Sequence, residues 1–238
     1  MRSFVARLFI PLFLLAAGGC ATTEATKDPW EGLNRKTFAF NDAVDKAVLK
    51  PVAQGYEKVT PAFVREGVNN FFGNLDDIGT SLNNFLQGKA GQGLTDAGRV
   101  VVNSFLGVFG LWDVATPMGL EKHEEDFGQT LGAWGVAPGP YFVIPLLGPS
   151  TVRDAPAKFA DPQWFIWPRA VDNEALYWSI WGFDKVRQRA NLLKAEAVLD
   201  EASLDRYSFV RDAWWQRRRN NVYDGSPPRE KDEEAPPK

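Results

Sequence analysis

Few side chains in this sequence are placed for covalent chemistry, and Ser150 lies in the segment closest to a catalytic motif. Residues 148–152 (GPSTV) nearly match the nucleophile elbow of α/β-hydrolases, but Val152 stands where the elbow has its second glycine. The single histidine, His123, precedes Ser150, whereas that fold places its histidine after the serine. The alternating strands of such a fold are also missing. We therefore predict that the chain is not an enzyme.

The sequence also gives little support for a metal-binding site or a phosphate-binding loop. Residues 123–126 (HEED) could offer oxygen and nitrogen ligands, but one histidine beside adjacent acids lacks the helix-face spacing of a transition-metal site. Gly88 and Lys89 lack the glycine, five residues before Gly88, that a phosphate-binding loop requires. We predict no metal site and no cofactor.

Cys20 is the only cysteine, and the residues before it have the composition of a secretory signal. Arg2 and Arg7 supply the basic start, residues 8–17 are apolar, and small residues lead into Cys20. Ten apolar residues are too few to span a bilayer, which needs about 20. A cysteine at the start of the mature chain supplies the thiol for a diacylglyceryl anchor with acyl chains such as palmitate.

This signal resembles a bacterial lipobox with one departure, because Ala17 stands where an aliphatic residue is usual. The alternative is an ordinary signal peptide with a chance cysteine, although a lone free thiol is unfavourable in an exported protein. Ala21, rather than aspartate, follows the cysteine, which favours the outer membrane. We predict a signal peptide over 1–19 and a lipidated tether over 20–27.

Composition limits the remaining possibilities. Removal of residues 1–19 leaves 219 of the 238 residues, enough for one large domain or at most two. Removing two arginines from the 27 basic residues leaves 25 against 30 acidic ones, so a nucleic-acid partner is not expected. Nine tryptophans and seventeen phenylalanines are typical of a chain at a membrane–water boundary.

Apolar residues recur at spacings of three and four through the first half of the chain, which predicts amphipathic helices. The first is expected from Asp28, as the cap, to Pro51, which should end it. A second should run from Thr60 to Gly73, a third over 75–88, and a fourth should begin at Leu94. No useful alternating pattern is present, so we predict an all-α fold.

Two long uncharged segments follow. Residues 100–112 are thirteen residues without a charge, too few to span a bilayer, which indicates a buried core helix or an interfacial segment. Residues 127–152 are 26 uncharged residues with four prolines and five glycines, so they cannot be one helix. A bent hairpin or re-entrant loop at membrane depth and a buried loop in a soluble core remain equal alternatives.

The C-terminal part is aromatic and then strongly charged. The aromatic residues suit core packing or an amphipathic belt with basic side chains reaching to headgroups: Trp164, Phe165, Trp167, Tyr177, Trp178, Trp181 and Phe183. Residues 184–219 read as a solvated helix, with the basic triplet 217–219 as its exposed end rather than a lipid contact. Residues 220–238 have the composition of a disordered tail.

Six segments together resemble one family, the VacJ/MlaA outer-membrane lipoproteins. They are DPWEGLNRKTFAFND (28–42), FFGNLDD (71–77), NNFLQGKAGQG (83–93), NSFLGVFGLWDVA (103–115), EDFGQTLGAWGVAPGPYFVIPLLGPSTVRD (125–154) and SLDRYSFVRDAWWQRR (203–218). The resemblance covers most of the mature chain, and it implies a single family domain over 28–219.

The resemblance implies a ring of amphipathic helices in the periplasmic leaflet of the outer membrane of a Gram-negative bacterium, with a Gly/Pro-rich hairpin loop beside a central channel. It also implies retrograde phospholipid transport that maintains lipid asymmetry. The expected partners are phospholipid, a porin trimer, a soluble periplasmic phospholipid carrier and then an inner-membrane ABC transporter. The alternative function is a non-transporting envelope adaptor that scaffolds porins.

Within this family's pattern, two groups of residues are expected to control lipid passage. The first-helix group is Phe38, Ala39, Phe40 and Asn41. The hairpin group is Gly132, Trp134, Gly135, Val136, Pro138, Gly139, Pro140, Tyr141 and Phe142. Cys20 is expected to carry the lipid anchor.

Overall fold

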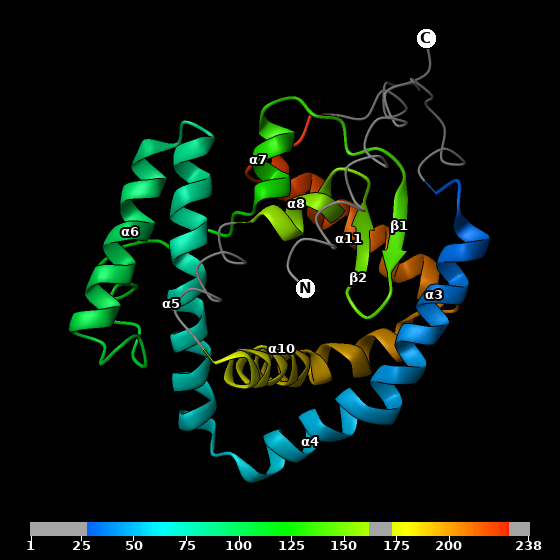
Figure 1. Ribbon diagram of the computed structural model, residues 1–238, viewed down its shortest axis with the longest axis horizontal. Coiled ribbons are helices and arrows are strands. Elements are labelled where there is room, and N and C mark those ends of the chain that lie inside the picture. Colours follow the sequence, from blue (N-terminus) through cyan, green and yellow to red (C-terminus); the bar gives the residue numbers. More distant parts are fainter. Residues whose placement is uncertain (1–27, 162–172, 229–238) are drawn as a thin grey trace.

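Helices follow one another around a ring in this protein (Figure 1). The computed structural model describes residues 28–161 and 173–228. The predicted signal peptide, Cys20 and the tether lie outside these residues, as do Trp164, Phe165 and Trp167. Apart from a two-stranded sheet, the described elements are helices, so the prediction of a helical fold is confirmed.

The first side of the ring is α3 (Glu31–Val44), which continues through the π-helical turn η2 (Asp45–Leu49) into α4 (Lys50–Val59). The prediction that Pro51 ends this helix is wrong. Proline has no N–H and crowds the preceding turn of an α-helix, but it is tolerated in a first turn, and Pro51 lies there in α4. The π-helical turn just before it widens the backbone, with the Lys50 N–H bonded to the Asp45 carbonyl.

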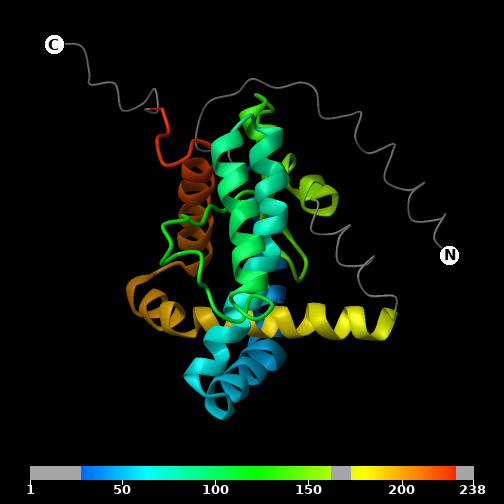
Figure 2. The same cartoon turned by 90° about the vertical axis from the view of Figure 1, so that its left-hand side faces the viewer.

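Helices α5 (Ala62–Leu86) and α6 (Ala90–Phe105) pack side by side as a helical hairpin, which both views show (Figures 1 and 2). The predicted break at Gly73 is wrong, because the helix continues through it and the Gly73 carbonyl accepts a hydrogen bond from Lys122 Nζ at 3.0 Å. The predicted end at Gly88 is confirmed. Gly88 has a φ of +79°, the left-handed conformation that commonly follows a helix C-terminus.

The uncharged segment 100–112 is not a buried core helix. Helix α6 ends at Phe105, and turns follow in which Val108 and Phe109 have φ values of 51° and 58°. The side chains of Phe105, Phe109 and Trp112 are 83%, 79% and 61% exposed. The core-helix alternative is therefore wrong, while the interfacial alternative stays a prediction.

The second uncharged segment folds as a short helix and a β-hairpin. Helix α7 (Phe127–Ala133) precedes strands β1 (Tyr141–Ile144) and β2 (Gly148–Thr151), and α8 (Asp154–Ala160) follows. The strands are antiparallel, with Tyr141 opposite Thr151 and Ile144 opposite Gly148. The sequence analysis predicted the interruption of the helix and a hairpin, but not the strand pairing.

The last two described helices are α10 (Glu174–Ala202), which packs along α4, and α11 (Arg206–Val222). Figure 2 shows α10 crossing the lower end of α5 and α6. The single helix predicted over 184–219 is two helices, interrupted between Ala202 and Arg206. The prediction that it is solvated is wrong for Arg187 and Glu196, which are buried. Helix α11 also continues to Val222, beyond the expected boundary at 219. Residues 229–238 of the predicted tail lie outside the described chain.

Polar residues fill much of the interior, and large apolar side chains point outward. The apolar core is small, with Tyr141, Val143 and Tyr207 packed against Phe38 and Trp214. Buried polar residues include Asn34, Asn74, Asp77, Thr80, Asn83, Asn84, Asp96, Arg99, Asn103, Gln129, Thr130 and Asp154. Exposed apolar residues follow the helices that form the perimeter: Leu33, Phe40, Val48, Val52, Val59, Phe63, Leu94, Val101 and Phe105. Within the described residues, no helix is both long and apolar enough to span a bilayer.

Candidate functional site

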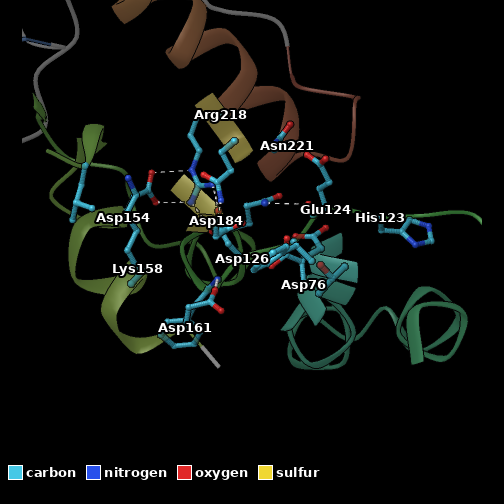
Figure 3. A pocket seen from close by; sticks show the side chains of 18 of the residues that line it. Asp76, His123, Glu124, Asp126, Asp154, Lys158, Asp161, Asp184, Arg218 and Asn221 are labelled. Carbon is cyan, nitrogen blue, oxygen red and sulfur yellow. Dashed lines mark hydrogen bonds and ion pairs between the residues drawn. The ribbon is translucent and has the colours of Figure 1, made fainter. Parts of the chain in front are cut away.

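A cavity of about 550 Å³ lies between α5, α7, α8, α10 and α11, next to the segment 122–126 (Figure 3). Side chains from these separate parts of the chain converge on it, including Asp76 from α5, Lys158 from α8 and Arg218 from α11. The charged side chains in its wall are Asp76, Lys122, Glu124, Glu125, Asp126, Asp154, Lys158, Asp161, Asp184, Lys185, Arg217 and Arg218. The wall is thus suited to a polar or charged group, and not to an apolar ligand alone.

Arg218 on α11 makes ion pairs at the start of α7 and in α8, and so it connects three of the helices around the cavity. Its Nη1 and Nη2 donate to the two carboxylate oxygens of Asp126 at 2.6 and 2.8 Å, and its Nε donates to Asp154 Oδ2 at 2.8 Å. Asp126 also caps α7, because its Oδ1 accepts the Gln129 N–H at 2.8 Å. A Cβ on Gly128 would come within 2.3 Å of the Arg218 guanidinium, so only glycine fits there. We call Arg218, Asp126 and Asp154 the Arg218 cluster.

Charge pairing decides the ionisation of the Arg218 cluster. Burial alone would raise the pKa of Asp126 and of Asp154. The hydrogen bonds and positive charge of Arg218 outweigh burial and hold both pKa values below their usual range. The prediction that residues 217–219 form a solvated basic end is therefore wrong for Arg218, although Arg217 is exposed.

Two other charged groups in the cavity wall are shifted the opposite way. Burial, reinforced by the nearby negative charge of Asp184, raises the pKa of Asp76 to about 6. Burial also lowers the pKa of Lys158, whose Nζ donates to the Pro149 carbonyl at 3.2 Å. For Asp76 and Lys158, the opposite charges nearby do not offset the cost of burying the charged form, whereas in the Arg218 cluster they do.

The HEED segment does not converge on one point. His123 Nδ1 lies 3.1 Å from Asp96 on α6, while Glu125 accepts from Gln87 and Lys89 at 2.7 and 3.0 Å. Asp126 belongs to the Arg218 cluster. Among the described residues, no group of three or more possible metal ligands comes together. Ser150 lies within β2 and is fully buried, unlike the exposed serine of a nucleophile elbow.

The first-helix group joins the hairpin rather than the cavity wall. Asn41 Nδ2 donates to the Ile144 carbonyl at 3.0 Å, and its Oδ1 accepts the Leu146 N–H at 2.8 Å. Two turns earlier, Asn34 makes the same pair of bonds with the Tyr141 carbonyl and the Val143 N–H, at 3.2 and 3.0 Å. Each side-chain amide thus pairs with the backbone of β1 or of the turn after it. We call Asn34 and Asn41 the asparagine pair.

The remaining members of this group divide between two faces of α3. Phe38 packs edge-on against Tyr207 with ring centroids 5.6 Å apart, while Ala39 and Phe40 are exposed. Tyr207 in turn donates its hydroxyl hydrogen to Asp28 Oδ2 at 2.5 Å, and Asn34 donates to the other oxygen at 2.7 Å. Asp28, expected to cap the first helix, instead links the start of the described chain to α11.

The hairpin group lies between α7 and the strands. Trp134 Nε1 donates to the Leu86 carbonyl at 2.9 Å, and Arg153 binds the carbonyls of Val136 and Pro138 at 3.2 and 3.1 Å. Pro140 accepts the Val152 N–H at 3.2 Å, Tyr141 packs on Trp214, and Phe142 packs on Trp30. A Cβ on Gly132 would meet Arg153 at 2.7 Å, while Gly135 and Gly139 have φ values of +89° and +67°.

No residue of the two predicted groups lines the cavity, to which the hairpin contributes Leu147. Four residues of the cavity wall were not predicted from the sequence as site residues: Asp76, Gln129, Lys158 and Arg218. All but Lys158 lie inside the segments that carry the family resemblance, and this was the only sequence feature that could have indicated them as site residues. Nothing in local spacing could show that these side chains meet, because they come from four different helices.

Loss of the asparagine pair should loosen the hairpin. We expect Asn34→Ala to lower the free energy of unfolding by about 2 kcal/mol, since two buried backbone groups lose their partners. Asn41→Ala should have about half that effect, because its bonds are partly exposed. Urea unfolding followed by circular dichroism measures both. Thr37→Ala is the control, because Thr37 lies between them and bonds only within its own helix; an equal loss in that control would refute a specific clamp.

The architecture and the cavity together define a class of helical protein with polar residues inside and apolar residues on the perimeter. Comparison with known proteins then identifies the family. The model of the MlaA lipoprotein family matches residues 26–221, so the chain belongs to this family.

Several relatives match over most of their length. The chain is 35% identical to the intermembrane phospholipid transport system lipoprotein MlaA of Escherichia coli (strain K12), over 84% of this chain and 81% of that protein. It is 28% identical to the protein of the same name from Haemophilus influenzae, over 90% and 89%. An uncharacterized protein of Rickettsia bellii is 36% identical over 82% and 76%.

A solved structure shares the fold. It is described as the structural basis for maintenance of bacterial outer membrane lipid asymmetry, and it matches with a TM-score of 0.69 and 34% identity. The match covers 84% of this chain and 99% of the other. The predicted family resemblance is thereby confirmed.

Proposed function

We propose that this protein is the outer-membrane component of an intermembrane phospholipid transport system and helps to maintain lipid asymmetry. The observation that carries the proposal is the inverted distribution of residues, with a charged cavity inside the ring and exposed apolar side chains along α3, α4, α5 and α6. The names of the relatives from Escherichia coli and Haemophilus influenzae support it.

The physical basis lies in the two parts of a phospholipid. Moving a charged headgroup into hydrocarbon without hydrogen-bonding partners costs a free energy of several kcal/mol or more. Acyl chains, in contrast, have a lower free energy in hydrocarbon than in water. A polar cavity inside an apolar ring offers the headgroup hydrogen-bonding partners and leaves lipid contacts to the perimeter. Such a protein lowers the barrier for lipid movement without making or breaking a bond, so we propose no catalytic step.

The finer features of the proposal follow from the family resemblance. The ring lies in the periplasmic leaflet, anchored by acyl chains on Cys20, and phospholipid moves from the outer leaflet towards a soluble carrier and an inner-membrane ABC transporter. A porin trimer holds the ring in place. The domain spans 28–219, and the first-helix group and the hairpin group control passage beside the cavity.

The proposal is tested in cells that lack the gene. We expect outer-leaflet phospholipid to rise, measured by its accessibility to an externally added phospholipase, and to return to normal with the wild-type gene. An unchanged outer leaflet in the deletion strain would refute the proposal.

Photocrosslinking separates transport from the adaptor alternative. A photoreactive residue replacing Ile180 in the cavity wall should form adducts with phospholipid, whereas one replacing the exposed Asp212 serves as the control. Adducts with protein alone at Ile180 would favour an adaptor that scaffolds porins.

A further inference from the structure

One largely buried carboxylate in the cavity wall, that of Asp76, makes no ion pair with the described residues. Within the described chain, Asp76 makes no hydrogen bond and no ion pair, whereas its neighbour Asp77 binds both Arg99 and Lys122. Asp184, across the cavity wall, is bonded to Arg187 at 2.6 Å. Burial therefore disfavours the charge of Asp76, and a bound cation would compensate it.

A second group in the same wall also lacks a donor. Gln129 is only 3% exposed, and its Nε2 donates to the Glu124 carbonyl at 3.1 Å. Its Oε1 accepts no hydrogen bond from the described residues. A buried acceptor without a donor destabilises a protein, so a ligand that carries N–H groups would be favoured here.

The overall charge of the wall points the same way. Among the described residues that line the cavity, seven are acidic and five are lysine or arginine. Arg218 is already neutralised by Asp126 and Asp154, so it is not free to bind an anion. Lys158 has no carboxylate within ion-pair distance in the described chain, which leaves one buried cation for a phosphate.

We propose that the cavity selects phospholipids whose headgroup carries an ammonium group, the group in phosphatidylethanolamine, over anionic phospholipids. The ammonium donates to the Asp76 carboxylate and to Gln129 Oε1, while the lipid phosphate faces Lys158. This inference rests on the proposed passage of phospholipid through the ring. A divalent cation is less suited to the site, because it needs several oxygen ligands close together, and no three acidic or histidine side chains converge in the described part of the chain.

The test uses the full-length lipoprotein, purified in detergent with an equimolar mixture of phosphatidylethanolamine and phosphatidylglycerol that carry the same photoreactive acyl chain. We expect the wild-type protein to crosslink about ten times more phosphatidylethanolamine, the ratio expected of one charge-assisted hydrogen bond at the low end of its usual strength. Asp76→Asn should bring the ratio close to one. Glu121→Gln is the matched control, because it removes one negative charge from an exposed residue outside the cavity wall and should leave the ratio unchanged.

A second measurement needs no variant. In the wild-type protein, phosphatidylethanolamine whose amine has been acetylated should lose its advantage over phosphatidylglycerol. Equal crosslinking of the two natural lipids, or an equal effect of Asp76→Asn and Glu121→Gln, would overturn the selectivity and leave phospholipid passage standing. No crosslink to any phospholipid would overturn the passage itself.

Discussion

Replacing Arg218 by methionine is expected to lower the free energy of unfolding by about 3–5 kcal/mol, the loss typical of a buried ion pair that keeps only one partner. Arg218 makes the ion pairs that join α11 to Asp126, at the start of α7, and to Asp154 in α8. Without it, the two negatively charged carboxylates would remain next to each other, with Arg153 as the remaining cation at Asp154. The variant should be measured by guanidinium unfolding and by its thermal midpoint.

Two controls separate this effect from the loss of any arginine. Arg217→Met removes an exposed neighbour and should change stability by less than about 0.5 kcal/mol. The double variant Arg218→Met, Asp126→Asn should recover part of the loss, because Asp154 keeps its ion pair with Arg153 and the unpaired carboxylate of Asp126 is gone. A loss in Arg217→Met as large as in Arg218→Met would contradict the assignment.

The pH dependence gives a further check on the Arg218 cluster. The pKa values of Asp126 and Asp154 are lowered in the folded protein, so both carboxylates bind protons less readily than in the unfolded chain. Their contribution to stability is therefore present above the ordinary carboxyl pKa of about 4 and is lost as the pH falls below it. The difference between wild type and Arg218→Met should shrink over that range. A difference that is constant down to pH 2 would argue against charge pairing.

The sequence predicted which segments are helical more reliably than where they end. Spacings of three and four in the apolar residues reflect the helix itself, and they predicted the helical segments that form α3, α5 and α6. Pro51 did not end the helical segment, because it lies in the first turn of α4, where a proline is tolerated. Gly73 did not end its helix either, and α5 continues through it. Gly88 did end its helix, since a left-handed φ after a helix C-terminus is a local requirement.

The site was harder to predict, because in this protein many polar residues are buried and many large apolar residues are exposed. A rule that places charged residues in water assigned Arg218, Arg187 and Glu196 to a solvated helix, yet all three are largely buried. The rule that apolar residues form the core assigned residues 100–112 to the interior, as one of two alternatives, yet Phe105 and Phe109 are exposed. Both errors have one cause. The proposed lipid surroundings would favour an apolar perimeter, and the aromatic content was the sequence feature that indicated it.

That inverted distribution leads to the second large expected effect, which concerns the exposed apolar tip after α6. We define the tip as Phe105, Phe109 and Trp112. Replacing all three by serine should weaken membrane binding by about a thousandfold, because each side chain contributes about 1.5–3 kcal/mol when it is removed from water. Binding is measured by flotation with liposomes, using a chain with Cys20→Ser so that no acyl anchor masks the loss.

The matched control keeps the tip apolar but changes its shape, with all three residues replaced by leucine. Because burial of apolar area does not depend on ring geometry, this variant should bind liposomes within about tenfold of the parent chain. Both variants should retain the helical circular dichroism of the parent, since the three side chains are exposed and pack little. If the serine variant bound liposomes as tightly as the leucine variant, the tip would face water or a protein partner rather than lipid. The membrane contact would then have to come from the other exposed apolar residues of the perimeter, above all those on α3 and α4.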